Sequence, residues 1–141
     1  MIAHRLRGLV NLHAVVVTVV ASLVFLVYAS LVPYVPRLDL SPDVRLSTYV
    51  ACIVAGMVVS TRVLALNASR FHRLNWIDAA RITSRQIIYM AMFIFAMMFA
   101  VKDRSISRIF VGSYLCICWA VLLFINQGLP RMLSRMVFQR Q

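Results

Sequence analysis

The chain has 141 residues, of which 62% are hydrophobic and 13% charged, and its formal net charge is +11. Soluble domains are nearer half apolar and a quarter charged, and a single core of this size cannot hide several apolar runs of about 20 residues. The basic residues lie between the apolar runs without interleaved aromatic side chains. This pattern favours membrane topology signals and anionic lipid headgroups, and it predicts no nucleic-acid partner.

The first apolar run predicts a membrane span over residues 9–32. Arg5 and Arg7 precede it, as in a secretory signal peptide, but the run is longer than the roughly 7–15 apolar residues of such a peptide. We therefore expect an uncleaved signal anchor. Pro33 and Pro36 follow the run and are expected to end the helix.

A second span is predicted over residues 47–66. Three small residues recur within it at intervals of four, namely Cys52, Gly56 and Ser60. A stripe of this kind lets another helix approach closely. The partner is either a helix of the same bundle or a second copy of the chain in a homo-oligomer, and the sequence leaves both open.

The stretch between the second and third spans is the most polar part of the chain. Asn75 is expected to cap a short helix that begins at Trp76, with Asp78 favourably placed in its first turn. Basic, Trp-bearing amphipathic turns commonly lie flat on a membrane surface. The third span, residues 82–101, is rich in Met and Phe, which suits helix packing or a groove for a prenyl chain.

The fourth span is predicted over residues 109–128, and Gly128 and Pro130 are expected to break it. Residues 129–141 then predict a short amphipathic helix. The expected fold is an all-α membrane protein with four transmembrane helices, a short amphipathic C-terminal helix and one domain spanning residues 1–141.

The distribution of charge predicts an orientation in the membrane. Ten of the fifteen basic residues lie at the two chain ends and between the second and third spans. The positive-inside rule therefore places both termini, the amphipathic tail and the middle loop in the cytoplasm.

Titratable side chains form no recognisable catalytic or metal site. Of the four acidic residues, only Asp39 and Asp43 are close in sequence, and they flank a proline turn rather than forming a favourable acid–base pair. The three histidines lack metal-ligand spacing. His13, one turn inside the first span, is expected to contact headgroups or water. The sequence predicts no catalytic residue, no metal ligand and no cofactor in this chain.

Basic side chains around the middle loop are the remaining candidates for binding. Guanidinium groups bind phosphate in a bidentate manner, so a lipid phosphate or diphosphate is a suitable guest. The alternative is that these residues only orient the protein in the membrane. The candidate residues are Arg62, Arg70, Arg73, Arg81 and Arg85.

Two segments carry a family resemblance. The stretches RLNWIDAARITSRQ and KDRSISRIFVGSYLCICWAVLLFINQGLPRMLSR, within residues 73–135, resemble the N-terminal membrane region of bacterial polyprenyl glycosylphosphotransferases. In that family a four-helix region precedes a cytoplasmic nucleotide-binding-like domain and a catalytic domain with an Asp–Glu pair and Mg²⁺. The catalytic domain transfers a sugar phosphate from a UDP-sugar to undecaprenyl phosphate and so starts exopolysaccharide synthesis.

The resemblance implies that this chain is a non-catalytic membrane anchor in the bacterial inner membrane, either a fragment or a stand-alone membrane region. Glu is absent from the sequence, so the family's Asp–Glu pair and its Mg²⁺ site cannot be carried over. Undecaprenyl phosphate is an implied partner. One alternative is a small four-span GtrA-like flippase of polyprenyl-linked sugars, although the spans predict few polar residues at mid-membrane. A purely structural partner subunit is another.

Overall fold

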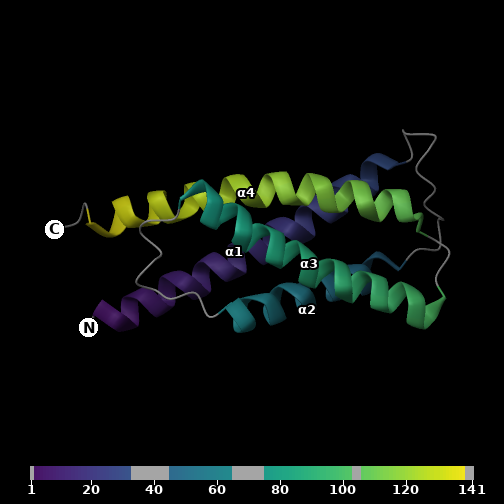
Figure 1. The fold of residues 1–141 in the computed structure, drawn as a ribbon, viewed down its shortest axis with the longest axis horizontal. Helices are drawn as coiled ribbons and strands as arrows, with labels where there is room; N and C mark the ends of the chain where they lie inside the picture. The colour runs from purple at the N-terminus through teal and green to yellow at the C-terminus, as the bar shows by residue number, and fades with distance from the viewer. Residues whose placement is uncertain (1, 33–44, 65–74, 103–105, 139–141) are drawn as a thin grey trace.

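The computed structural model describes residues 2–32, 45–64, 75–102 and 106–138. Within these ranges it describes the side chains from residue 10 to 128 other than that of Leu64, together with Gly8. These residues form four α-helices (Figure 1). The helices are α1 (Ile2–Leu31), α2 (Leu46–Leu64), α3 (Trp76–Val101) and α4 (Arg108–Phe138).

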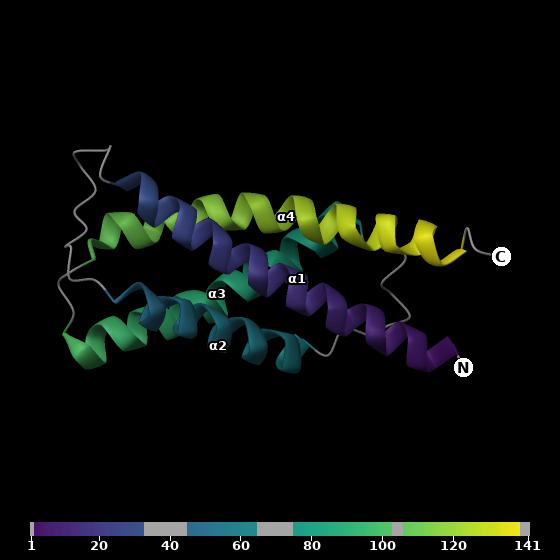
Figure 2. The same ribbon diagram turned by 180° about the vertical axis from the view of Figure 1, so that it is seen from behind.

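The helices form an antiparallel bundle in which each one packs against two others. The packed pairs are α1 with α2, α2 with α3, α3 with α4, and α4 with α1. Seen from both sides, successive helices run in opposite directions along the bundle. The beginning of α1 and the end of α4 lie at the same end of the bundle (Figures 1 and 2). We call this end the termini end.

Each helix contains an apolar stretch long enough to cross a membrane. The four stretches are Val10–Leu31, Leu46–Val63, Trp76–Val101 and Arg108–Gly128. The shortest has 18 residues, which at 1.5 Å per residue spans about 27 Å and approaches the roughly 30 Å hydrocarbon layer. Large apolar side chains also cover the outer surface of the bundle, where they would contact lipid. The chain is a multi-pass membrane protein, which confirms the predicted all-α class with four spans.

The third helix begins earlier than the predicted span. Asn75 is its N-cap, as predicted, and its side-chain oxygen accepts a hydrogen bond from the backbone N–H of Trp76 at 2.8 Å. The expected separate surface turn is wrong, because one continuous helix runs from Trp76 to Val101. Neither Pro nor Gly interrupts this stretch. The helix ends at Lys102, whose φ of 51° is left-handed.

The fourth helix does not break at Gly128 and Pro130. It runs as one helix from Arg108 to Phe138, so the separate C-terminal helix predicted over residues 129–141 is not observed. Pro130 removes one hydrogen bond, the one its missing N–H would have donated to the carbonyl of Asn126, and helices in apolar surroundings tolerate this. The predicted amphipathic character of the tail rests on side chains outside the described residues.

The interior changes in character along the bundle. Opposite the termini end it is aromatic: the Phe25 ring lies 6.1 Å from Tyr49, 6.0 Å from Phe110 and 5.2 Å from Tyr114, measured between ring centroids. The middle is filled by fully buried aliphatic and sulfur-bearing side chains. These include Val17, Ala21, Met57, Met90 and Leu122. The termini end of the interior is polar.

Candidate functional site

A layer of buried polar side chains crosses the bundle near its termini end, and every helix contributes to it. The members are exposed by 3% or less: His13 (3%), Ser60 (0%), Thr83 (0%), Gln86 (2%) and Asn126 (1%). They occupy similar depths, since His13 lies three residues inside Val10 and Asn126 two residues before Gly128, the ends of two apolar stretches. We call these five residues the polar layer.

Asn126 on α4 connects α1 and α3 within the layer. Its Oδ1 lies 2.8 Å from Nε2 of His13 on α1. Its amide nitrogen donates to Oγ1 of Thr83 at 2.8 Å and to Oε1 of Gln86 at 2.9 Å, both on α3. One side chain therefore joins three helices through hydrogen bonds that water cannot replace in a lipid environment.

The hydrogen-bond directions in the layer follow from which groups have a proton to donate. The Thr83 hydroxyl donates its proton to the carbonyl of Ala79 at 2.8 Å, so towards Asn126 its oxygen can only accept. The Asn126 nitrogen must then face α3, and the Asn126 oxygen must face His13. Nε2 of His13 is consequently the donor and carries a proton.

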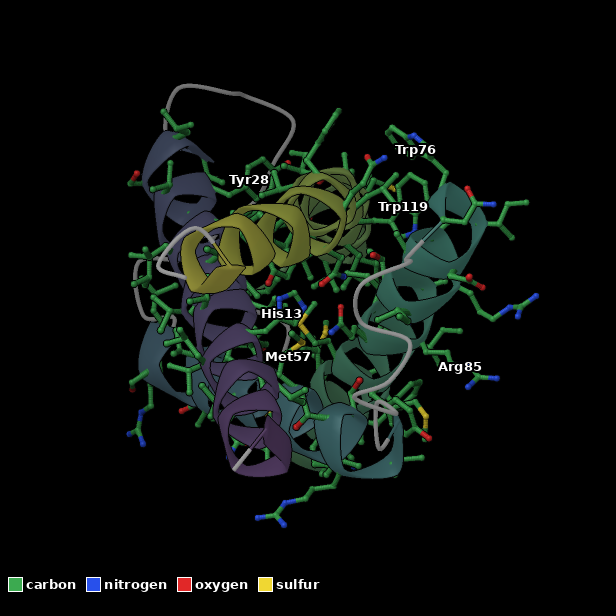
Figure 3. All side chains as sticks on the ribbon, turned by 90° about the vertical axis from the view of Figure 1, so that its left-hand side faces the viewer. His13, Tyr28, Met57, Trp76, Arg85 and Trp119 are labelled. Atoms are coloured by element: carbon green, nitrogen blue, oxygen red, sulfur yellow. The ribbon has the colours of Figure 1, made fainter. Side chains whose placement is uncertain are left out.

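The expected contact of His13 with headgroups or water is wrong. The side chain is buried and points into the interior of the bundle, where Figure 3 also shows Met57. The expectation of few polar residues at mid-membrane is compatible with this, because the polar layer lies near the ends of the apolar stretches and apolar side chains fill the middle of the interior. The sequence pattern of a single polar residue near the end of a span is the same whether the residue faces lipid headgroups or neighbouring helices. Only the packing of the helices distinguishes the two cases.

Ser60 on α2 is level with the rest of the layer. The backbone of Gly56 lies against that of Met90, and because α2 and α3 are antiparallel, four residues along α2 correspond to four back along α3. Ser60 is therefore level with Gln86. Among the described residues, the buried Ser60 hydroxyl has no hydrogen-bond partner.

Replacement of Ser60 by Ala should leave the stability of the bundle unchanged or raise it, by up to about 1 kcal/mol. A buried hydroxyl without a partner carries an uncompensated desolvation cost, and alanine removes that cost at little loss of volume. The measurement is the unfolding midpoint of the purified protein in detergent. A loss of more than 1 kcal/mol would show that the hydroxyl is bonded in the folded protein.

The small residues predicted for helix packing lie on or beside the contact between α2 and α3. A Cβ atom at Gly56 would lie 2.8 Å from the Cα of Met90 and 3.1 Å from its nitrogen, so the two backbones touch here. Ser60 is fully buried one turn further on, and Cys52 is half-buried one turn before. Gly56 thus serves packing inside the bundle.

The predicted phosphate-binding arginines divide into two groups. Arg70 and Arg73 lie outside the described residues. The other three, Arg62 on α2 with Arg81 and Arg85 on α3, are exposed. Arg85 points away from the bundle interior (Figure 3), so these cations do not converge on the polar layer. Arg81 and Arg85 are one helical turn apart and share a face of α3.

The chemistry available in the described part of the chain is hydrogen bonding rather than acid–base or metal chemistry. No group of three or more His, Cys, Asp or Glu there is placed to hold a metal ion. His13 is the one titratable member of the polar layer, and amides and hydroxyls form the rest. The layer suits helix locking or recognition of a polar group.

No protein-family model, curated protein or solved structure matches the chain. The resemblance of residues 73–135 to the glycosylphosphotransferases therefore stays a prediction, and function has to be argued from the bundle.

Proposed function

We propose that the chain is the membrane anchor of a bacterial polyprenyl glycosylphosphotransferase, with no catalytic role of its own. The observation that carries this proposal is the form of the bundle: four spans, both chain ends at one end, and α4 continuing as a helix for ten residues beyond its apolar stretch. A cytoplasmic region joined to such a helix would be held close to the membrane in a restricted orientation.

The charge of the chain supports the cytoplasmic placement of the termini end. In the sequence, ten of the fifteen basic residues lie before the apolar stretch of α1, after that of α4 or between residues 62 and 85, and the positive-inside rule directs these segments to the cytoplasm. In a bacterium this is the inner membrane. The partners that follow are the bilayer, anionic lipids and undecaprenyl phosphate, and a homo-oligomer is compatible with the lipid-facing surface.

The transcript that encodes the chain tests this proposal. We expect the reading frame to continue beyond the codon for Gln141 into a nucleotide-binding-like and a catalytic domain. We also expect the isolated chain to form no lipid-linked product from UDP-sugar, Mg²⁺ and undecaprenyl phosphate. A stop codon directly after Gln141, or product formed by the chain alone, would contradict the proposal.

The polar layer favours a second candidate, a small GtrA-like flippase of polyprenyl-linked sugars. Polar side chains inside transmembrane bundles commonly mark substrate pathways, and here all four helices supply one. Proteoliposomes separate the two candidates. Translocation of a lipid-linked sugar by the chain, abolished in Asn126→Leu, would favour the flippase, whereas an anchor would give no translocation.

A further inference from the structure

We propose that the outward face of α3 binds an anionic phospholipid, with the lipid phosphate held by Arg81 and Arg85 and an acyl chain lying along the apolar side chains beyond them. This inference requires that the bundle sits in a membrane, but it does not depend on the assignment to the glycosylphosphotransferases. Failure of the lipid test would leave the anchor proposal standing.

Between Arg81 and Phe99, the exposed residues of α3 form one continuous stripe along the helix. From Arg81 they recur at intervals of three or four, which is the spacing of a single helix face. The stripe consists of Arg81, Arg85, Ile88, Met92, Ala96 and Phe99. Its large apolar members are more than half exposed, with values of 56% for Ile88, 61% for Met92 and 76% for Phe99. Charge therefore lies at the termini end of the stripe, and only apolar surface follows.

The position of Arg85 inside the apolar boundary favours binding of a phosphate to its guanidinium group. Arg85 lies between Thr83 and Gln86, and both of these bond to Asn126, which is two residues inside the apolar stretch of α4. The guanidinium thus leaves the helix about one turn inside the apolar boundary and faces outward. A charge in that position is costly unless its side chain reaches towards the surface and finds an anion.

Arg81 provides the second half of the site. It lies one turn closer to the termini end on the same face, so two guanidinium groups can hold one phosphate between them, and charge-assisted bonds of this kind are strong. Asp78 is exposed three residues before Arg81 on the same side of α3, where its carboxylate lowers the net positive charge that faces the phosphate. An anionic lipid can contact the two arginines with its phosphate and the apolar part of the stripe with an acyl chain. Free phosphate can contact only the two arginines.

Native mass spectrometry of the full chain in detergent tests the proposal, with phosphatidylglycerol, phosphatidylcholine and inorganic phosphate as probes. We expect the chain to retain phosphatidylglycerol over phosphatidylcholine. The double variant Arg81→Gln, Arg85→Gln should lose about thirtyfold in affinity for phosphatidylglycerol, the loss expected when two basic residues near the membrane surface are neutralised. Asp78→Asn should bind about twofold more tightly. Inorganic phosphate should not displace the lipid at equal concentration.

The matched control is the double variant Lys102→Gln, Arg108→Gln, which removes the same charge at the opposite end of the bundle. It should change the affinity less than twofold. An equal loss in this control, or no loss in the α3 variant, would overturn the proposal, and displacement by inorganic phosphate would reassign the site to the free anion. Should the glutamine variant misfold, Arg81→Lys with Arg85→Lys keeps the charge but loses the guanidinium fork. An unchanged affinity in that variant would also overturn the proposal.

Discussion

Replacement of Gly56 by alanine is expected to lower the free energy of unfolding by about 2 kcal/mol, and replacement by leucine to separate α2 from α3. A Cβ atom at this position would lie 2.8 Å from the Cα of Met90 and 3.1 Å from the carbonyl oxygen of Tyr89. Both are backbone atoms that cannot swing away, so the helices must move apart. Overpacking of a well-packed interior typically costs about 1–3 kcal/mol.

Gly112 on α4 supplies the matched control. It is exposed, and a Cβ atom there would meet nothing within 4 Å. Gly112→Ala should therefore leave stability unchanged or raise it by up to about 1 kcal/mol, because alanine is the better helix former. Both variants can be compared by denaturant titration in detergent, followed by the fluorescence of Trp76 and Trp119. Equal destabilisation of the two would show that the α2–α3 contact is looser than described.

Asn126→Leu is expected to destabilise the bundle by about 2–3 kcal/mol. The substitution preserves volume approximately but removes hydrogen bonds to three side chains on two other helices, His13, Thr83 and Gln86. Interhelical bonds in membranes are worth about 0.6 kcal/mol on average and up to about 1.7 kcal/mol. The polar groups left in the interior without Asn126 add a desolvation cost.

A double-mutant cycle separates this network from a general effect of lost polarity. Thr83→Val should cost about 1 kcal/mol alone and much less in the Asn126→Leu background, because both variants break the same bond. Asn11, an exposed amide at the same end of the bundle, provides the control, and Asn11→Leu should shift stability by less than about 0.5 kcal/mol. Additive effects of Thr83→Val and Asn126→Leu would contradict the network.

The spans were predictable because hydropathy summed over about 20 residues is a strong signal. The helix ends were not. Residues 76–81 and 129–138 are more polar than the spans. A polar stretch of the same composition can either continue a transmembrane helix or form a separate element, so composition does not distinguish the two. In both places the chain stays helical, with one helical hydrogen bond missing at Pro130, and the isolated surface elements that polarity suggested are parts of α3 and α4.

The polar layer carries a signal in the sequence that was missed. His13, Val17, Ala21 and Phe25 recur every four residues and are all buried, and Asn126 follows Tyr114, Cys118 and Leu122 at the same interval. The polar residues thus continue the core stripes of their helices. In a span that is apolar on every side, however, nothing marks which stripe faces inward, and hydrogen bonds between positions 113 residues apart leave no local pattern.

Because Arg70 and Arg73 lie outside the described residues, the phosphate-binding role of the arginines stays a prediction. Their closeness in sequence predicted one phosphate-binding group of five. In the described part of the chain only Arg81 and Arg85 share a helix face, and Arg62 lies on another helix. The spacing of four residues within α3 was sufficient to place Arg81 and Arg85 on one face. Their position relative to Arg62 on α2 depends on how the two helices pack.

We propose that four spans hold both chain ends on the cytoplasmic side of a membrane. Labelling of single-cysteine variants with a membrane-impermeant maleimide, in a background without Cys52, Cys116 and Cys118, distinguishes this topology from its alternatives. We predict that Lys102→Cys reacts in intact spheroplasts, while Ile2→Cys and Gln141→Cys react only in inside-out vesicles. Labelling of positions 2 and 141 from opposite sides, or of both in intact spheroplasts, would contradict the account.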